Sequence, residues 1–117
     1  MEGLWTIEFG SNIGVFGSGV IVLRNGRIEG GDSNYFYLGS YEKESHGGGY
    51  PTKFRATISA KPFMKGSPSV FKTVDREFTL RLEGSLRDEG NGTAVGKPEG
   101  MPGMDIGIRL TRRSSTA

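Results

Sequence analysis

A two-residue alternation between apolar and polar side chains is the feature that most constrains this chain. Residues 52–61 show it most clearly, with Phe54, Ala56, Ile58 and Ala60 alternating with Lys, Arg, Thr and Ser residues. Successive side chains of a β-strand point to opposite faces, so the pattern predicts a strand with one buried face. The same period recurs along most of the sequence, which predicts an all-β protein.

Turn signals divide the alternating segments. Asn25-Gly26 predicts a tight hairpin because both turn positions need a positive φ, and Gly30-Gly31-Asp32 is expected to break the pairing that follows. Residues 62–74 predict a crossing loop, with at most one helical turn near residues 69–72. We expect eight strands, over residues 3–9, 16–24, 27–30, 34–44, 52–61, 76–87, 93–97 and 104–110.

The glycine content favours a barrel over a sandwich. The chain has 20 glycines in 117 residues, and several fall inside the expected strands, where glycine permits the bends that closure requires. We therefore predict an antiparallel β-barrel of about eight strands over residues 1–113. The tail is expected to fray from Arg112, with residues 114–117 outside the domain.

An eight-stranded barrel has an interior that side chains just fill or that holds one small ligand. Both alternatives stay open at the level of sequence. The interior is expected to contain a set of aromatic residues on the inward faces: Trp5, Phe9, Tyr37, Tyr41 and Phe54. Trp5 is the only tryptophan, so its emission is expected to shift if a ligand enters.

Charge and cysteine content limit the partners. The net charge of +2 comes from 15 basic and 13 acidic side chains, a mixed surface that does not indicate direct nucleic-acid binding. The chain has no cysteine, which excludes disulfides and thiolate metal sites and fits a reducing cytoplasm. The sequence shows no signal peptide and no apolar run long enough to span a membrane, so we expect a cytoplasmic protein.

No group of residues predicts catalysis. His46 begins an HGGG sequence that resembles the oxyanion motif of esterases, but the nucleophile elbow that this motif needs is absent. Glu42 and Glu44 are paired carboxylates of the kind that do acid–base chemistry, yet Lys43 stands between them and a solvated strand end is the better interpretation. We expect no enzymatic activity, no cofactor and no metal site.

The tyrosine-rich segment at residues 34–44 is apolar on both faces. Tyr35, Tyr37 and Tyr41 share one face, and stacking on nucleic-acid bases is one use of such a row. The segment does not match the aromatic signature of sheet-based RNA readers, so an interior position is favoured. The opposite face carries Phe36 and Leu38. With residues 20–23, it exceeds what one small core needs, and we expect a homodimer to cover the surplus.

Four segments together resemble a known family: GLWTIEF, GSGVIVLRNGRIEGGDSNYFYLGSYE, SVFKTVDREFTLRLEGS and MPGMDIGIRLTRR. They are similar to the GrlR-type proteins, small bacterial negative regulators of type III secretion. The resemblance covers residues 3–113. It implies a lipocalin-like barrel with an apolar interior, a homodimer, and binding of a transcriptional activator in place of DNA.

The resemblance also implies a partner-binding segment directly after the tyrosine-rich strand. The corresponding residues here carry two acids and one base, and the candidate contacts are Glu42, Lys43, Glu44, His46 and Tyr50. Two functions follow. The first is a regulatory protein that sequesters another protein, and the second is a carrier or sensor of a small apolar ligand held in the barrel.

Overall fold

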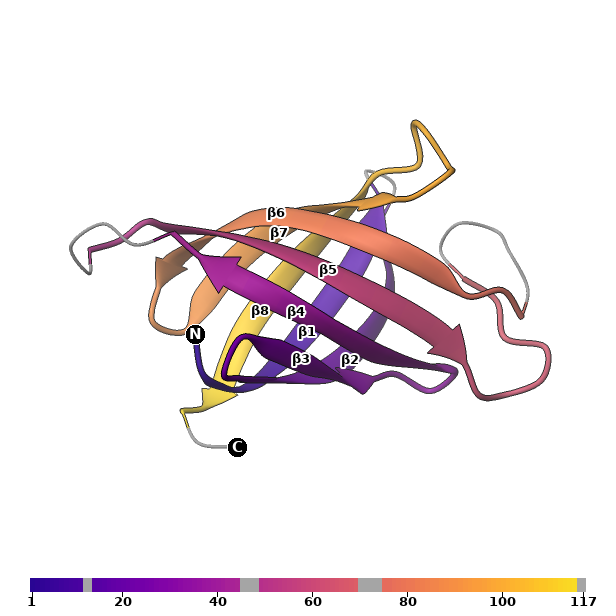
Figure 1. Cartoon of the computed structure of the whole chain (residues 1–117), viewed down its shortest axis with the longest axis horizontal. Helices are drawn as coiled ribbons and strands as arrows, with labels where there is room; N and C mark the ends of the chain where they lie inside the picture. Colours follow the sequence, from indigo (N-terminus) through magenta and orange to yellow (C-terminus); the bar gives the residue numbers. More distant parts are fainter. Residues whose placement is uncertain (12–13, 45–48, 70–74, 116–117) are drawn as a thin grey trace.

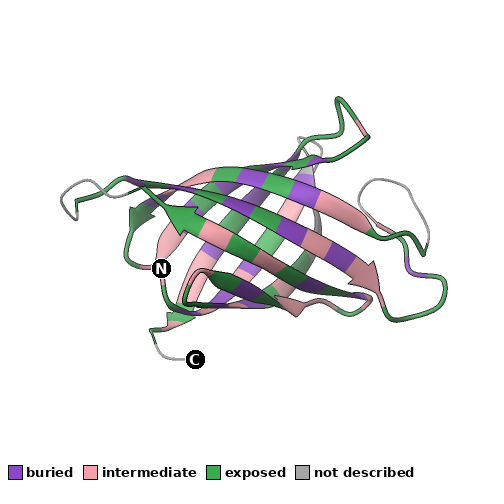
Figure 2. Ribbon diagram, viewed as in Figure 1, coloured by how far each residue is buried: buried purple, intermediate pink, exposed green. Residues whose placement is uncertain are grey.

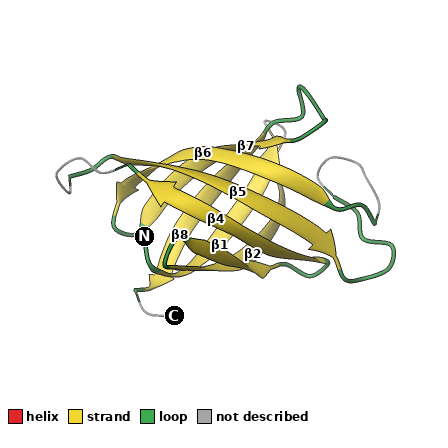
Figure 3. Ribbon diagram, viewed as in Figure 1, coloured by secondary structure: helices red, strands yellow, loops and turns green. Residues whose placement is uncertain are grey.

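The chain folds into a closed barrel of eight antiparallel strands (Figure 1). The computed structural model describes the chain except residues 12–13, 45–48, 70–74 and 116–117. The strands are β1 (Gly3–Ser11), β2 (Gly14–Arg24), β3 (Arg27–Gly31), β4 (Tyr35–Lys43), β5 (Thr52–Pro62), β6 (Phe78–Asp88), β7 (Asn91–Pro98) and β8 (Ile106–Ser114). Figure 3 shows strands and loops only, and the described residues contain no helix. The predicted all-β barrel is confirmed.

Alternation sets the inside and the outside of the barrel. In β5 the predicted residues Phe54, Ala56, Ile58 and Ala60 are all buried, while Lys53, Arg55 and Thr57 are exposed. The stripes of buried and exposed residues continue around the barrel in Figure 2. Each inward side chain leaves water when the sheet closes, and full burial of a Leu or Phe stabilises by about 1.5–3 kcal/mol.

The Asn25-Gly26 turn forms as predicted. Asn25 has a φ of 52° and Gly26 a φ of 77°, the left-handed values that a two-residue hairpin needs to match the twist of its strands. Arg24 pairs with Arg27 directly beside the turn. The local sequence therefore fixes the register between β2 and β3.

The break in pairing predicted at Gly30-Gly31-Asp32 begins only at Asp32, because β3 continues through Gly30 and Gly31. Gly31 pairs with Val20 on one side and with Phe36 on the other. The reason is close approach, because a Cβ on Gly30 would lie 2.1 Å from the carbonyl oxygen of Val20. The missing side chains let neighbouring strands pass closely, so glycine keeps β3 in the sheet at this point.

The final strand is longer than its sequence pattern suggests. The expected strand ends at residue 110 and the tail is expected to fray from Arg112, but β8 continues to Ser114. Arg112 pairs with Trp5, and Ser114 pairs with Leu4. Because β1 supplies these pairs from the other end of the chain, alternation within the last segment could not reveal them. A helical turn is expected near residues 69–72. Residues 70–72 of that segment lie outside the described residues.

The outer face of β2 and β4 carries apolar side chains in the single chain. Val20, Phe36 and Leu38 are 45%, 38% and 42% exposed. Val20 and Phe36 are the two partners of Gly31, which places no side chain between them. The second apolar face that the sequence indicated is thus present on the outer surface of this chain.

In the described part of the chain, no helix has the length and hydropathy to cross a bilayer.

Candidate ligand cavity

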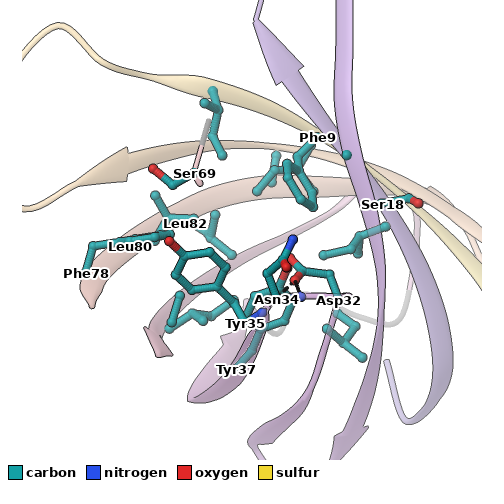
Figure 4. Close-up of a pocket in the computed structure, with 18 of the residues that line it drawn as sticks. Phe9, Ser18, Asp32, Asn34, Tyr35, Tyr37, Ser69, Phe78, Leu80 and Leu82 are labelled. Carbon is teal, nitrogen blue, oxygen red and sulfur yellow. Dashed lines mark hydrogen bonds between the residues drawn. The ribbon is translucent and has the colours of Figure 1, made fainter. Parts of the chain in front are cut away.

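The barrel interior contains a cavity. A cavity of about 610 Å³ lies between the strands and is lined mainly by aliphatic and aromatic side chains (Figure 4). Ile7, Ile58, Leu82 and Ile108 form part of its wall. Small-molecule sites in proteins occupy about 300–1,000 Å³ and are mostly apolar. This space has the size and the chemistry of such a site.

The β3–β4 and β5–β6 connections stand at the open end of the cavity. Asp32, Ser33 and Asn34 join β3 to β4, while Pro68 and Ser69 belong to the β5–β6 connection, and all five residues line the cavity. Polar groups therefore lie at one end of a space whose remaining walls are apolar. Such a distribution orients a ligand that has one polar end.

Asp32 is the centre of these polar groups. One carboxylate oxygen accepts hydrogen bonds from the backbone N–H groups of Asn34 and Tyr35, each at 2.8 Å. The other oxygen accepts a hydrogen bond from the Tyr37 hydroxyl. An aspartate that binds backbone groups two and three residues ahead builds a tight turn, so the local sequence fixes the carboxylate where β4 begins.

Burial and the bond to Asp32 raise the pKa of the Tyr37 hydroxyl, with burial the larger cause. The phenol therefore stays protonated and continues to donate to the carboxylate across the neutral range. The pair forms a fixed polar contact in an otherwise apolar wall.

The described part of the β5–β6 connection is anchored at Ser67, which is 1% exposed. The Tyr35 hydroxyl donates to the Ser67 carbonyl oxygen at 3.0 Å. The Asp75 carboxylate accepts from the backbone N–H of Ser67 at 2.7 Å and of Gly66 at 2.9 Å. The Tyr35 ring packs on Phe78 with ring centroids 5.7 Å apart. These contacts give the rim of the cavity a fixed position.

The opposite end of the barrel is packed. Trp5 is fully buried there, and its indole N–H donates to the carbonyl oxygen of Met1 at 2.9 Å. The guanidinium carbon of Arg112 lies 5.5 Å from the Trp5 ring centroid, and the same group donates to the carbonyl oxygens of Glu2 and Glu89. Buried residues that do not line the cavity complete this end: Leu23, Ile28, Ala56 and Leu86.

A second group of contacts at the packed end joins Glu2 to the β2–β3 turn and to β4. The Glu2 carboxylate accepts from the Asn25 backbone N–H at 3.0 Å and from the Tyr41 hydroxyl at 2.8 Å. Burial, and then the bond to Glu2, raise the pKa of Tyr41 to about 12. The hydrogen bonds from Asn25 and Tyr41 lower the pKa of Glu2.

The structure divides the predicted aromatic interior between these two ends. Phe9, Tyr37 and Phe54 line the cavity, whereas Trp5 and Tyr41 belong to the packed end. Trp5 does not line the cavity and has its own fixed partners, so the structure shows no direct contact through which its emission would report ligand entry. Phe9 and Tyr41 are half-buried, and the other three are buried.

The predicted partner-binding segment lies at the packed end, away from the cavity mouth. Glu42, Lys43 and Glu44 are exposed at the end of β4, and Tyr50 is 48% exposed before β5 begins. His46 falls outside the described residues. A second hollow, of about 630 Å³ and with acidic and basic residues in its wall, is lined in part by Glu42, Lys43 and Glu44. The two sequence-based hypotheses therefore concern opposite ends of one barrel.

Sequence reasoning missed the role of Asp32, which it treated only as part of a break between strands. The signal was present, because an aspartate two residues before an asparagine at a strand junction is typical of a side-chain-capped turn. Among the residues that the structure describes, no three His, Asp or Glu side chains lie together in a way that would hold a metal ion.

No protein-family model matches the chain, and no curated protein matches its sequence.

Proposed function

We propose that this protein is a non-enzymatic binding protein whose barrel interior holds one small apolar molecule. The observation that supports the proposal is the cavity of about 610 Å³ with its aliphatic and aromatic wall. Transfer of apolar surface from water to such a wall is favourable by about 25 cal/mol per Å². A pre-formed cavity binds without the cost of ordering its own walls.

Binding of an environment-sensitive apolar dye tests this proposal. We expect one dye per chain, with a rise in the dye's own emission, and displacement by an aliphatic molecule. Trp5 emission is not a suitable signal because Trp5 lies at the packed end. A chain that binds no dye at any accessible concentration contradicts the proposal.

A matched pair of variants locates the dye. Ala94 lines the cavity, while its neighbour Val95 is 47% exposed on the outer face. Ala94→Leu adds side-chain volume inside the cavity and should weaken dye binding by about tenfold, the equivalent of ~1.4 kcal/mol. Val95→Leu adds a carbon to the outside and should leave binding unchanged. Equal effects of the two variants would place the dye elsewhere.

A second function rests on the exposed end of β4. In this proposal the protein captures another protein, such as a transcriptional activator, in the manner of the GrlR-type regulators that the sequence resembles. Glu42, Lys43 and Glu44 support it because they are exposed and adjacent. The apolar outer face with Phe36 and Leu38 supports a homodimer in the same proposal, and the absence of cysteine supports a cytoplasmic location.

Two measurements test this second function. Exposed charges act mainly on association rate and salt sensitivity, so Glu42→Lys with Glu44→Lys should reduce capture of an activator-type partner most strongly at low salt. Equal capture by the wild type and the double variant across a salt series would exclude the segment. Light scattering tests the homodimer, and a monomer mass at micromolar concentration would exclude it.

A further inference from the structure

The charge at the cavity mouth differs in sign from the charge of the whole chain. The chain carries a net charge of +2. Among the described residues that line the cavity, however, Asp32 is the only Asp, Glu, Lys or Arg residue. A ligand that enters meets a carboxylate at the mouth and apolar groups beyond it.

The partners of Asp32 fix its position without neutralising it. Among the described residues its donors are two backbone amides and the hydroxyl of Tyr37, and none of these three carries a positive charge. A carboxylate offers about four acceptor sites. The contacts of the described residues use three of these sites, and a donor that a ligand brings would take the fourth.

A second carboxylate strengthens the negative potential at this end. Asp75 is bound to the backbone of Gly66 and Ser67 on the rim. Burial raises the pKa of Tyr35, and the charges of Asp75 and Asp32 raise it further. Because Tyr35 lines the cavity, the two carboxylates lie close enough to the cavity mouth to act on a group there.

We propose that the cavity takes an amphiphile with an apolar chain and a cationic amine head, and that the head binds the Asp32 carboxylate. This inference rests on the proposed function of the cavity as an apolar-ligand site. An ammonium group donates a charge-assisted hydrogen bond, which is about twice as strong as a neutral one. A fatty acid would bring its own carboxylate to the same place, and like charges at that distance repel.

The test compares three probes that share one chain: decylamine, decanol and decanoic acid, each below the concentration at which it forms micelles. Each probe displaces a bound apolar dye from the wild-type protein at neutral pH. We expect decylamine to bind about tenfold more tightly than decanol, ~1.4 kcal/mol, with decanoic acid the weakest. Equal affinities, or a preference for the acid, overturn the inference.

Asp32→Asn provides the residue-level test. Asparagine keeps an oxygen that accepts from the Asn34 and Tyr35 amides, so the turn is retained while the charge is removed. The preference for decylamine over decanol should fall to within about twofold, a difference below ~0.5 kcal/mol. Glu29→Gln is the matched control, because Glu29 is exposed on β3 and does not line the cavity. It should keep the wild-type preference.

The outcomes separate this inference from the proposed function. If decanol and the dye bind but Asp32→Asn leaves the amine preference unchanged, the head does not bind Asp32 and the cavity function stands. If neither dye nor decanol binds, both ideas fail. If Asp32→Asn does not fold, the order of the three probes in the wild type decides the inference on its own.

Discussion

The two ends of this barrel are built from the same eight strands but hold different contents. At one end Trp5 fills the interior. Its indole N–H donates to Met1, and Arg112 lies over its ring and donates to Glu2. At the other end the strands surround a cavity of about 610 Å³ with Asp32 at its mouth. We expect from this difference that side chains at the packed end contribute more to stability than those that line the cavity. The following predictions test that division.

The largest expected effect comes from removing an aromatic ring at each end. Trp5→Ala should lower the free energy of unfolding by about 3–5 kcal/mol, because it leaves a cavity in a filled region. It also removes the bond to Met1 and the contact with Arg112. Phe78→Ala at the half-buried cavity rim should cost less than about 2 kcal/mol. Urea unfolding midpoints measure both, and equal losses would contradict the division.

Replacing one alanine at each end with leucine should reduce stability by different amounts. Ala56 is buried but does not line the cavity, so Ala56→Leu should overpack the interior and cost about 1–3 kcal/mol. Ala94→Leu projects into existing space and should cost less than about 1 kcal/mol while it weakens dye binding. Thermal unfolding with and without dye distinguishes the two. A larger loss for Ala94→Leu would show that the cavity wall is as tightly packed as the opposite end.

Arg112 should be the most sensitive charged residue at the packed end. Arg112→Lys keeps the charge but removes the planar group that lies on Trp5 and donates to Glu2 and Glu89. The expected loss of stability is about 1–2 kcal/mol. Arg113→Lys is the control, since Arg113 is exposed and donates only to Thr6 in the described contacts, and it should cost less than about 0.5 kcal/mol. Chemical unfolding of both variants measures the contrast.

The smallest expected effect is a pH dependence at the packed end. The pKa of Tyr41 is about 12 in the folded chain, above its ordinary value of 10.0. A raised pKa favours the protonated state on folding, so this contribution is complete below pH 10.0 and decreases as the pH rises through about 12. Tyr41→Phe should therefore flatten the alkaline loss of stability. Identical slopes for the variant and the wild type would contradict the role of the bond to Glu2.

Local patterns predicted most of the fold. The alternation in residues 52–61 identified the inward side chains of β5, and Asn25-Gly26 fixed the turn between β2 and β3. Both signals act between residues that are close in sequence. The continuation of β8 to Ser114 was not predictable in this way, because its partners Leu4 and Trp5 are supplied by the first strand.

The candidate site was less accessible to sequence reasoning. Periodicity predicts that Ile58 and Leu82 point inward, but it does not give the volume left between them once the ring closes. Aromatic content suggested one shared interior, whereas Trp5 and Phe9 on the same strand belong to opposite ends. The sequence shows Asp32 only as a turn residue. Its place at the cavity mouth depends on the closed barrel, which local sequence does not reveal.

The pairing of β1 with β8 has a consequence for the order of assembly. Each of the other strand pairs joins consecutive strands and can form as a hairpin while later parts of the chain are still being made. The β1–β8 seam, with partners such as Glu8 and Arg109, must wait for the last strand, and until then both edges of the sheet stay open to other chains. Trp5 meets Arg112 only at that step, so its fluorescence should time the closure of the ring during refolding.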